Sequence, residues 1–178
     1  MKRRMFFGVA LLLFACGVQA ALTSAQMATL KAAIIADSVL NAYPNTSDGN
    51  FALCAEKLNV VASPAYVVWD SEVTPAEWSV GVLAGATQID ALTQGKRDEL
   101  FWIVKDTRNA GDVAVRNAID DATGSQNTLK NALIAAMKRN ALLVEKILAV
   151  GVGTTASPAV LGWSGPVDYQ DVMQARGM

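Results

Sequence analysis

The amino-acid sequence predicts a mainly α protein: a single compact helical domain with an irregular Gly/Pro-rich segment before a short C-terminal helix. Two observations predict this class. Hydrophobic residues make up 52% of the 178 residues and charged residues 17%, a balance that supports a packed core and excludes a disordered chain. Apolar residues also recur at spacings of three and four along most of the chain, which places them on one face of a helix.

The first half of the chain carries clear helix starts. Thr23 and Gln26 form a capping-box pattern, which predicts a first helix over residues 22–37. A second helix is predicted over residues 48–58, after a cluster of turn-forming residues. Residues 60–73 contain a β-branched and aromatic stretch, and we expect them to be extended or helical.

A sharper start lies at Pro75. Thr74 can cap the helix, and Glu77 stands three residues after the cap, a pattern typical of a helix N-terminus with proline in the first position. The end is expected near Gly81 or Gly85. Further helices are predicted over three ranges: 87–92, 93–105 and 112–122.

Two expectations concern side-chain direction. In the helix over residues 93–105, we expect Leu100, Phe101 and Val104 to face inward. The longest helix is predicted over residues 125–150, about 39 Å if unbroken. Six of its apolar residues form one stripe, which we interpret as a core seam: Leu129, Leu133, Met137, Ala141, Val144 and Leu148.

The end of the chain has a different composition. Glycines and prolines between residues 151 and 166 prevent the helix from continuing, so the chain must turn or run extended before a last short helix over residues 167–176. Trp163 lies in this segment. It is the candidate interaction residue, as an anchor either onto a partner or onto the domain's own surface.

Residues 1–20 have the pattern of a secretory signal, and residues 21–178 form the helical domain. A basic start and an apolar run precede Ala20 and Ala21, between which we expect cleavage. Alternatively, Cys16 ends a stretch that resembles a bacterial lipobox and would carry a lipid. A third interpretation is that translation begins downstream. Without the leader, Cys54 is the single cysteine, and we expect it to be a small buried hydrophobe.

The composition excludes several kinds of chemistry. The chain has no histidine, which removes Ser-His-Asp and Cys-His triads and histidine-based zinc motifs. The pattern G-x-G-x-x-A over residues 151–156 follows a helix instead of a strand, so no nucleotide site is expected. We predict no catalytic, cofactor-binding or metal-binding residues. A net charge of −1 gives no general attraction for nucleic acid.

Acidic pairs are the remaining candidates for chemistry: Asp98/Glu99, Asp120/Asp121 and Asp168/Asp171. Only the last pair shares a helix face, where Asp168 is placed to cap the helix N-terminus. An enzyme that uses carboxylates alone would need two acids in one cleft, and the spacing does not predict such a cleft.

Short motifs also occur in a fixed order over residues 22–177. They are Leu22-Thr23-Ser24-Ala25-Gln26, Leu30-Lys31, Ala62-Ser63-Pro64-Ala65, Val68-Trp69, Val115-Arg116, Glu145-Lys146, Gly151-Val152-Gly153-Thr154-Thr155-Ala156-Ser157-Pro158-Ala159, Tyr169-Gln170-Asp171-Val172 and Ala175-Arg176-Gly177. In this order the chain resembles a family of small proteins encoded by tailed bacteriophages and prophages.

The resemblance implies a non-enzymatic phage structural or morphogenesis protein, at the head–tail junction or the tail. Its partners would be other phage structural proteins or further copies of itself, in the virion or the host cytoplasm. The family begins near Leu22, so the leader is a departure. The alternative is an exported, periplasmic or lipid-anchored helical interaction protein, which would meet a membrane only through the leader or a lipid.

Overall fold

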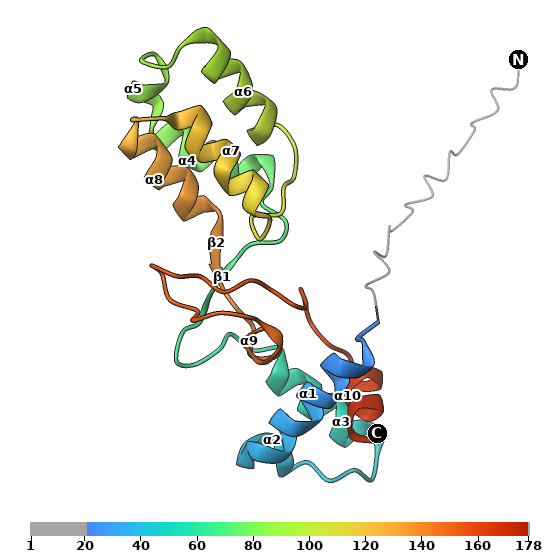
Figure 1. Ribbon diagram of the computed structural model, residues 1–178. Coiled ribbons are helices and arrows are strands. Elements are labelled where there is room, and N and C mark those ends of the chain that lie inside the picture. Colours follow the sequence, from blue (N-terminus) through green and yellow to red (C-terminus); the bar gives the residue numbers. More distant parts are fainter. Residues whose placement is uncertain (1–20, 178) are drawn as a thin grey trace, which may run out of the picture.

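The structure is a computed structural model that describes residues 21–177. The mainly α class predicted from the sequence is confirmed, since the described residues hold helices and one small two-stranded sheet. Figure 1 shows two groups of helices that meet at a narrow waist. We call these groups the lower lobe and the upper lobe.

The lower lobe combines both ends of the described chain. It contains α1 (Ser24–Ala36), α2 (Ser38–Asn41), α3 (Asp48–Leu58), α9 (Leu143–Leu148) and α10 (Tyr169–Gly177). The two predicted caps hold. Thr23 accepts a hydrogen bond from the Gln26 N–H at 3.3 Å, and Asp168 accepts from the backbone N–H groups of Gln170 and Asp171 at 2.8 and 2.9 Å. The short helix α2 was not predicted.

The upper lobe is formed by the residues between the two strands. It contains α4 (Pro75–Ala84), α5 (Ala86–Ile89), α6 (Gln94–Val104), α7 (Val113–Thr123) and α8 (Asn127–Ala136). The capping box at Thr74 and Glu77 starts α4 as predicted. Helices α4 and α8 pack closely, because a Cβ at Gly85 would come within 2.5 Å of the Leu129 Cα. A glycine is therefore required there.

The waist holds the sheet and the segment that follows α9. Strands β1 (Val67–Trp69) and β2 (Lys138–Asn140) pair antiparallel, with Val68 opposite Arg139. Residues 149–168, which we call the strap, run from α9 across the waist and back to α10 (Figure 1).

The predicted helix over residues 125–150 is wrong as one element. It is divided into α8, β2 and α9, because residues 138–140 pair with β1. The six stripe residues are nevertheless buried, as the core-seam interpretation requires. They serve separate clusters, since Leu129, Leu133 and Met137 pack in the upper lobe and Val144 and Leu148 in the lower lobe.

One inward-facing expectation is also wrong. Phe101 is 49% exposed, whereas Ile103 is buried beside Leu100 and Val104. Successive helical residues point about 100° apart, so the apolar run over residues 100–104 cannot face inward throughout. The next residue, Trp102, is 62% exposed.

Cys54 lies in the core of the lower lobe. Burial raises the pKa of its thiol, which reduces the reactive thiolate fraction. In a Cys16→Ser chain, we expect Cys54 to react with a disulfide reagent at least about tenfold more slowly in the folded protein than in denaturant. Stopped-flow absorbance measures both rates, and equal rates would contradict the burial.

Candidate functional site

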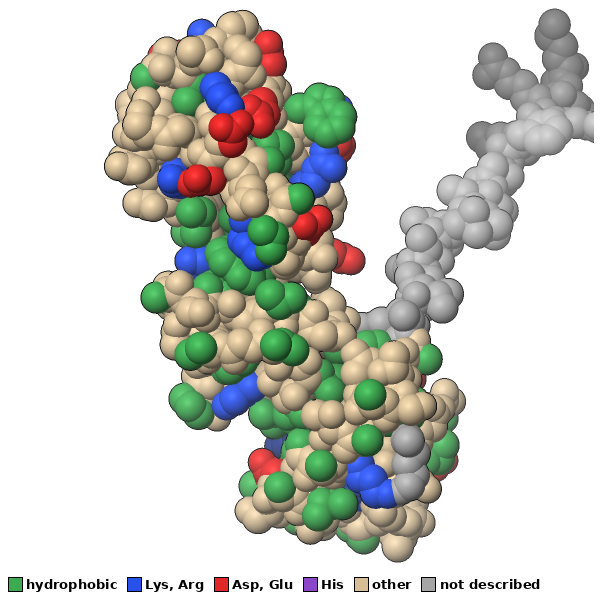
Figure 2. Space-filling model, in the orientation of Figure 1, with side chains coloured by type: hydrophobic (Ala, Val, Ile, Leu, Met, Phe, Trp, Pro, Cys, Tyr) green, Lys and Arg blue, Asp and Glu red, His purple; other side chains and the backbone are tan. Residues whose placement is uncertain are grey.

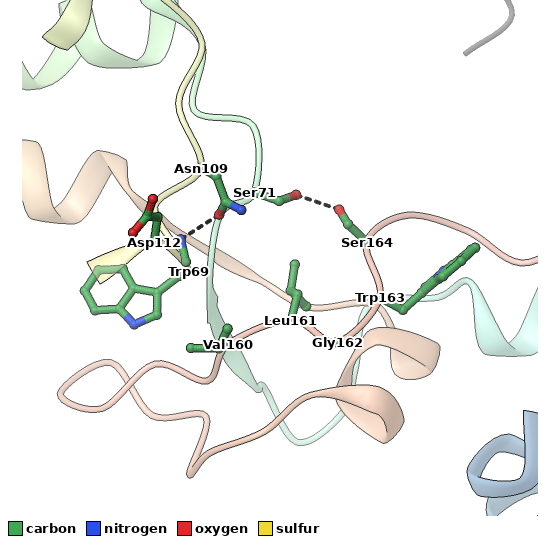
Figure 3. A pocket seen from close by; sticks show the side chains of 10 residues that line it. Trp69, Ser71, Asn109, Asp112, Val160, Leu161, Gly162, Trp163 and Ser164 are labelled. Carbon is green, nitrogen blue, oxygen red and sulfur yellow. Dashed lines mark hydrogen bonds between the residues drawn. The ribbon is translucent and has the colours of Figure 1, made fainter. Parts of the chain in front are cut away.

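The lobes meet at a cleft of about 530 Å³ in the waist, and this cleft is the candidate functional site (Figure 3). Its walls come from the end of β1, from the loop before α7 and from the strap. Each wall is placed by backbone pairing. The N–H of Trp69 donates to the Ala159 carbonyl at 2.9 Å, and the N–H of Ala110 donates to the Asp70 carbonyl at 2.8 Å.

The strap closes one side of the sheet. The Val67 N–H donates to the Gly153 carbonyl at 2.8 Å, and the Ala159 N–H donates to the Val67 carbonyl at 3.0 Å. The strap thus acts as a partial third strand beside β1. Buried backbone groups need such partners, so the strap completes the sheet between the lobes.

Polar side chains line the cleft in a fixed pattern. The Ser71 and Ser164 hydroxyls are 2.6 Å apart and join the upper lobe to the strap. The side-chain amide oxygen of Asn109 accepts from the Gly111 N–H at 2.7 Å. The Asp112 carboxylate caps α7 by accepting from the Ala114 N–H at 2.8 Å. These groups hold the loops that form the cleft.

Two tryptophans stand on opposite sides of the cleft, and their rings extend away from one another (Figure 3). The Trp69 ring is held between α7 and β2, because the Arg116 guanidinium lies 4.8 Å and the Lys138 ammonium 5.3 Å from its centroid. Such contacts between cations and aromatic rings are each worth about 0.5–1 kcal/mol at exposed sites.

Trp163, the predicted interaction residue, packs inside the molecule. It is 9% exposed and belongs to the core of the lower lobe. Its indole N–H donates to the Gly165 carbonyl at 3.1 Å. Of the two roles considered for Trp163, the structure favours the intramolecular one, because the ring packs against the domain's own residues in the core of the lower lobe.

A buried ion pair joins the sheet of the waist to α9 of the lower lobe. The Glu145 side chain is 1% exposed and accepts from both terminal nitrogens of Arg139 at 2.6 and 2.7 Å. It also accepts from the N–H groups of Leu142 at 2.8 Å and Gly165 at 2.9 Å. Arg139 reaches Asp70 at 3.5 Å as well. One carboxylate therefore joins β2, the start of α9 and the strap.

The charge state of Glu145 follows from these contacts. Burial by itself raises the pKa of the carboxyl, but the hydrogen bonds from Arg139, Gly165 and Leu142 outweigh it and leave the pKa below its ordinary value of 4.5. A carboxyl with a lowered folded-state pKa stabilises the fold above its unfolded pKa, and this stabilisation is lost as the pH falls through the folded-state pKa.

We therefore expect the free energy of unfolding to be nearly constant from pH 7 to about pH 5 and to fall in more acidic solution. Urea titrations at a series of pH values measure this. In a Glu145→Gln variant the decline should be shallower, because the buried carboxyl no longer takes up a proton. An equally steep decline in both proteins would contradict the role of Glu145.

The other predicted acidic pairs have partners of their own. Asp98 accepts from the Gln94 amide at 2.7 Å, and Glu99 pairs with Lys96 at 3.1 Å. Asp121 also pairs with Lys96, and Asp120 pairs with Lys130. These carboxylates thus lie in surface ion pairs and helix contacts of α6, α7 and α8, outside the waist cleft.

The glycine-rich run over residues 151–156 forms a turn of the strap. Gly151 and Gly153 have φ values of 134° and 71°, which side-chain-bearing residues rarely adopt. A Cβ at Gly153 would also meet the Tyr66 ring at 2.1 Å. The glycines therefore serve the turn and its close packing against Tyr66.

The proposed cleavage and lipidation residues lie at the edge of the described chain or outside it. Ala21 is the first described residue and is exposed, whereas Ala20 and Cys16 lie outside the described residues. None of the helices within residues 21–177 has the length and apolar character needed to cross a bilayer.

Sequence reasoning missed two features: the Arg139–Glu145 pair and the exposed Trp102. The sequence held no signal for the first, because Leu142 has no side-chain acceptor that could form a capping box with Glu145. For Trp102 the signal was its place in an apolar run too wide for one helix face.

Within residues 21–177, no group of three or more acidic or cysteine side chains is placed to hold a metal ion. No family model, curated protein or solved structure matches this chain.

Proposed function

We propose that this protein is a non-enzymatic phage structural or morphogenesis protein that acts through contacts with other virion proteins, at the head–tail junction or in the tail. The observation that carries the contact role is the exposed aromatic pair on α6. Trp102 is 62% exposed and Phe101 49%, and side chains of this kind are enriched where proteins bind one another.

The surroundings of Trp102 support this role. The Lys105 ammonium lies 4.9 Å and the Arg108 guanidinium 5.2 Å from the ring centroid, so the ring is held outward between two cations. A large apolar ring that is fixed in water loses the hydrophobic free energy that burial would supply. Contact with a partner would recover it.

Further apolar side chains are exposed on the waist and the lower lobe. Figure 2 shows hydrophobic side chains scattered over both, while acidic and basic side chains gather on the upper lobe. The exposed ones include Val150 and Val152 of the strap and Ile35 and Val39 of the lower lobe. The phage setting rests on the resemblance carried by the ordered motifs.

The test uses particles from a cell that carries the prophage. We expect the chain in gradient-purified particles, starting near Leu22 by mass, and we expect deletion of its gene to reduce infectious particles. Complementation with Trp102→Ala should lower incorporation at least about tenfold, the effect of an interface residue worth 1.4 kcal/mol. The matched control is Glu56→Gln, which changes an exposed side chain of α3. Absence of the chain from particles, with unchanged infectivity after deletion, would overturn the proposal.

The leader favours a second candidate, an exported or lipid-anchored helical interaction protein. Its basic start and apolar run are typical of a signal. The mass of the protein from its native cell separates the two candidates. Loss of residues 1–20, or a diacylglyceryl group on Cys16, supports export, and a start near Leu22 without processing supports the virion role.

A further inference from the structure

A cavity of about 240 Å³ lies in the lower lobe, where the last turn of α10 meets α1 and the segment that follows α2. We call it the α10 pocket. Figure 1 shows α1 and α10 side by side in this lobe. The volume equals that of about eight water molecules in the liquid, so the pocket has room for a small molecule. Its lining consists of Lys31, Ile35, Asn41, Tyr43, Pro44, Asn45 and Arg176.

The Arg176 guanidinium is fixed at this pocket by neutral acceptors. Its Nη2 donates to the Leu40 carbonyl at 2.9 Å, and its Nη1 donates to the Tyr43 carbonyl and to the Asn45 side-chain oxygen. A guanidinium has five N–H donors. The Nε–H of Arg176 has no hydrogen-bond partner within residues 21–177, and its nitrogen is not buried. Arg176 therefore keeps its full charge and a donor for a ligand.

Lys31 brings a second positive charge to the pocket from α1. Neither Lys31 nor Arg176 belongs to any ion pair found within residues 21–177, and the lining contains no carboxylate. The Asp37 carboxylate caps α2 by accepting from the N–H groups of Val39 and Leu40. Both cations are partly buried. Partly desolvated charges without a counter-ion favour an anionic occupant.

The number of charges and the apolar part of the lining narrow the class of anion. A phosphate monoester carries about −1.5 to −2 at pH 7 and three acceptor oxygens, so it matches two cations better than one carboxylate does. Arginine binds phosphate through several N–H groups, and lysine binds it as a point charge. Ile35 is 58% exposed and lies beside Tyr43 and Pro44 in the lining. An organic group would cover this apolar surface.

We propose that the α10 pocket binds the phosphate monoester of a small organic molecule. The phosphate lies between Lys31 and Arg176, and the organic group lies against Ile35, Tyr43 and Pro44. This inference goes beyond the proposed function and does not rest on it, so the failure of one leaves the other standing.

The test follows the proton NMR signals of phenyl phosphate as the purified full-length chain is added. We expect saturable broadening with the wild type and at least about tenfold weaker binding by Lys31→Gln, which removes one of the two charges. Lys31 makes no hydrogen bond within residues 21–177, so this variant should fold. The matched control is Lys57→Gln, which makes the same change in net charge at an exposed site of α3 and should bind as the wild type does.

A second arm varies the ligand and uses the wild type alone. Phenyl sulfate has the same shape but a single negative charge, and inorganic phosphate lacks the organic group. Each should compete with phenyl phosphate at least about tenfold more weakly than unlabelled phenyl phosphate itself. The proposal is overturned if phenyl phosphate does not bind saturably, or if Lys31→Gln and Lys57→Gln weaken binding equally, because the attraction is then to net charge. Equal competition by either ligand also overturns it.

Discussion

Replacing Trp78 by alanine is expected to lower the free energy of unfolding by about 4 kcal/mol. Trp78 lies on α4 and is among the largest fully buried side chains of the described residues. Its ring fills the centre of the upper lobe, among residues that include Leu129 and Leu133 of α8. Truncation removes this burial and leaves a cavity, because α4 and α8 are already in close contact at Gly85 and cannot collapse further.

One feature of Trp78 reduces the expected loss. Its indole nitrogen is buried with no hydrogen-bond partner among the described residues, and removal of an unsatisfied donor regains free energy. The matched control is Trp102→Ala, which deletes the same ring from a site that is 62% exposed and should cost less than about 1 kcal/mol. Urea unfolding followed by circular dichroism measures both variants. Equal losses would contradict the placement of one ring inside and the other outside.

The second large effect is expected for Glu145→Gln, which should lower the free energy of unfolding by about 3 kcal/mol at pH 7. The amide keeps the shape of the carboxylate but loses its charge. It also turns an NH₂ group toward donors, since all four groups that contact Glu145, on Arg139, Leu142 and Gly165, are N–H groups. Removing one partner of a buried pair leaves the other charge poorly compensated, which is the costly case.

Two further variants locate the cause of that loss. Glu56→Gln makes the same chemical change at an exposed site of α3 and should alter stability by less than about 0.5 kcal/mol. The double variant Arg139→Met with Glu145→Leu replaces both charges by apolar groups and should be more stable than Glu145→Gln alone. If the double variant is the less stable of the two, the uncompensated charge is not the cause.

Local signals in the sequence predicted most helix starts. The caps at Thr23, Thr74 and Asp168 are formed by side chains within three residues of the backbone groups that they satisfy. Such hydrogen bonds depend on neighbours in the chain alone, so no knowledge of the fold is needed to find them. The burial of Cys54 and of the stripe residues followed from the same local patterns.

The break between α8 and α9 could not be predicted in this way. The apolar stripe keeps a helical period through Met137 and Ala141, although the chain is extended between these residues. Residues 138–140 are held extended by β1, some 70 positions earlier in the chain. The candidate site depends on this pairing, because the cleft lies beside the sheet, at the end of β1.

The sequence by itself determined the mainly α class, most of the helix starts and the burial of Cys54 and of the apolar stripe, because each depends on hydrogen bonds and periodicity within a few residues. Only the tertiary structure decided that the buried stripe serves two lobes, that Trp163 faces inward while Trp102 faces outward, and that Glu145 joins three segments. These features depend on contacts between segments far apart in the chain, and their free energies are set by which groups the fold removes from water.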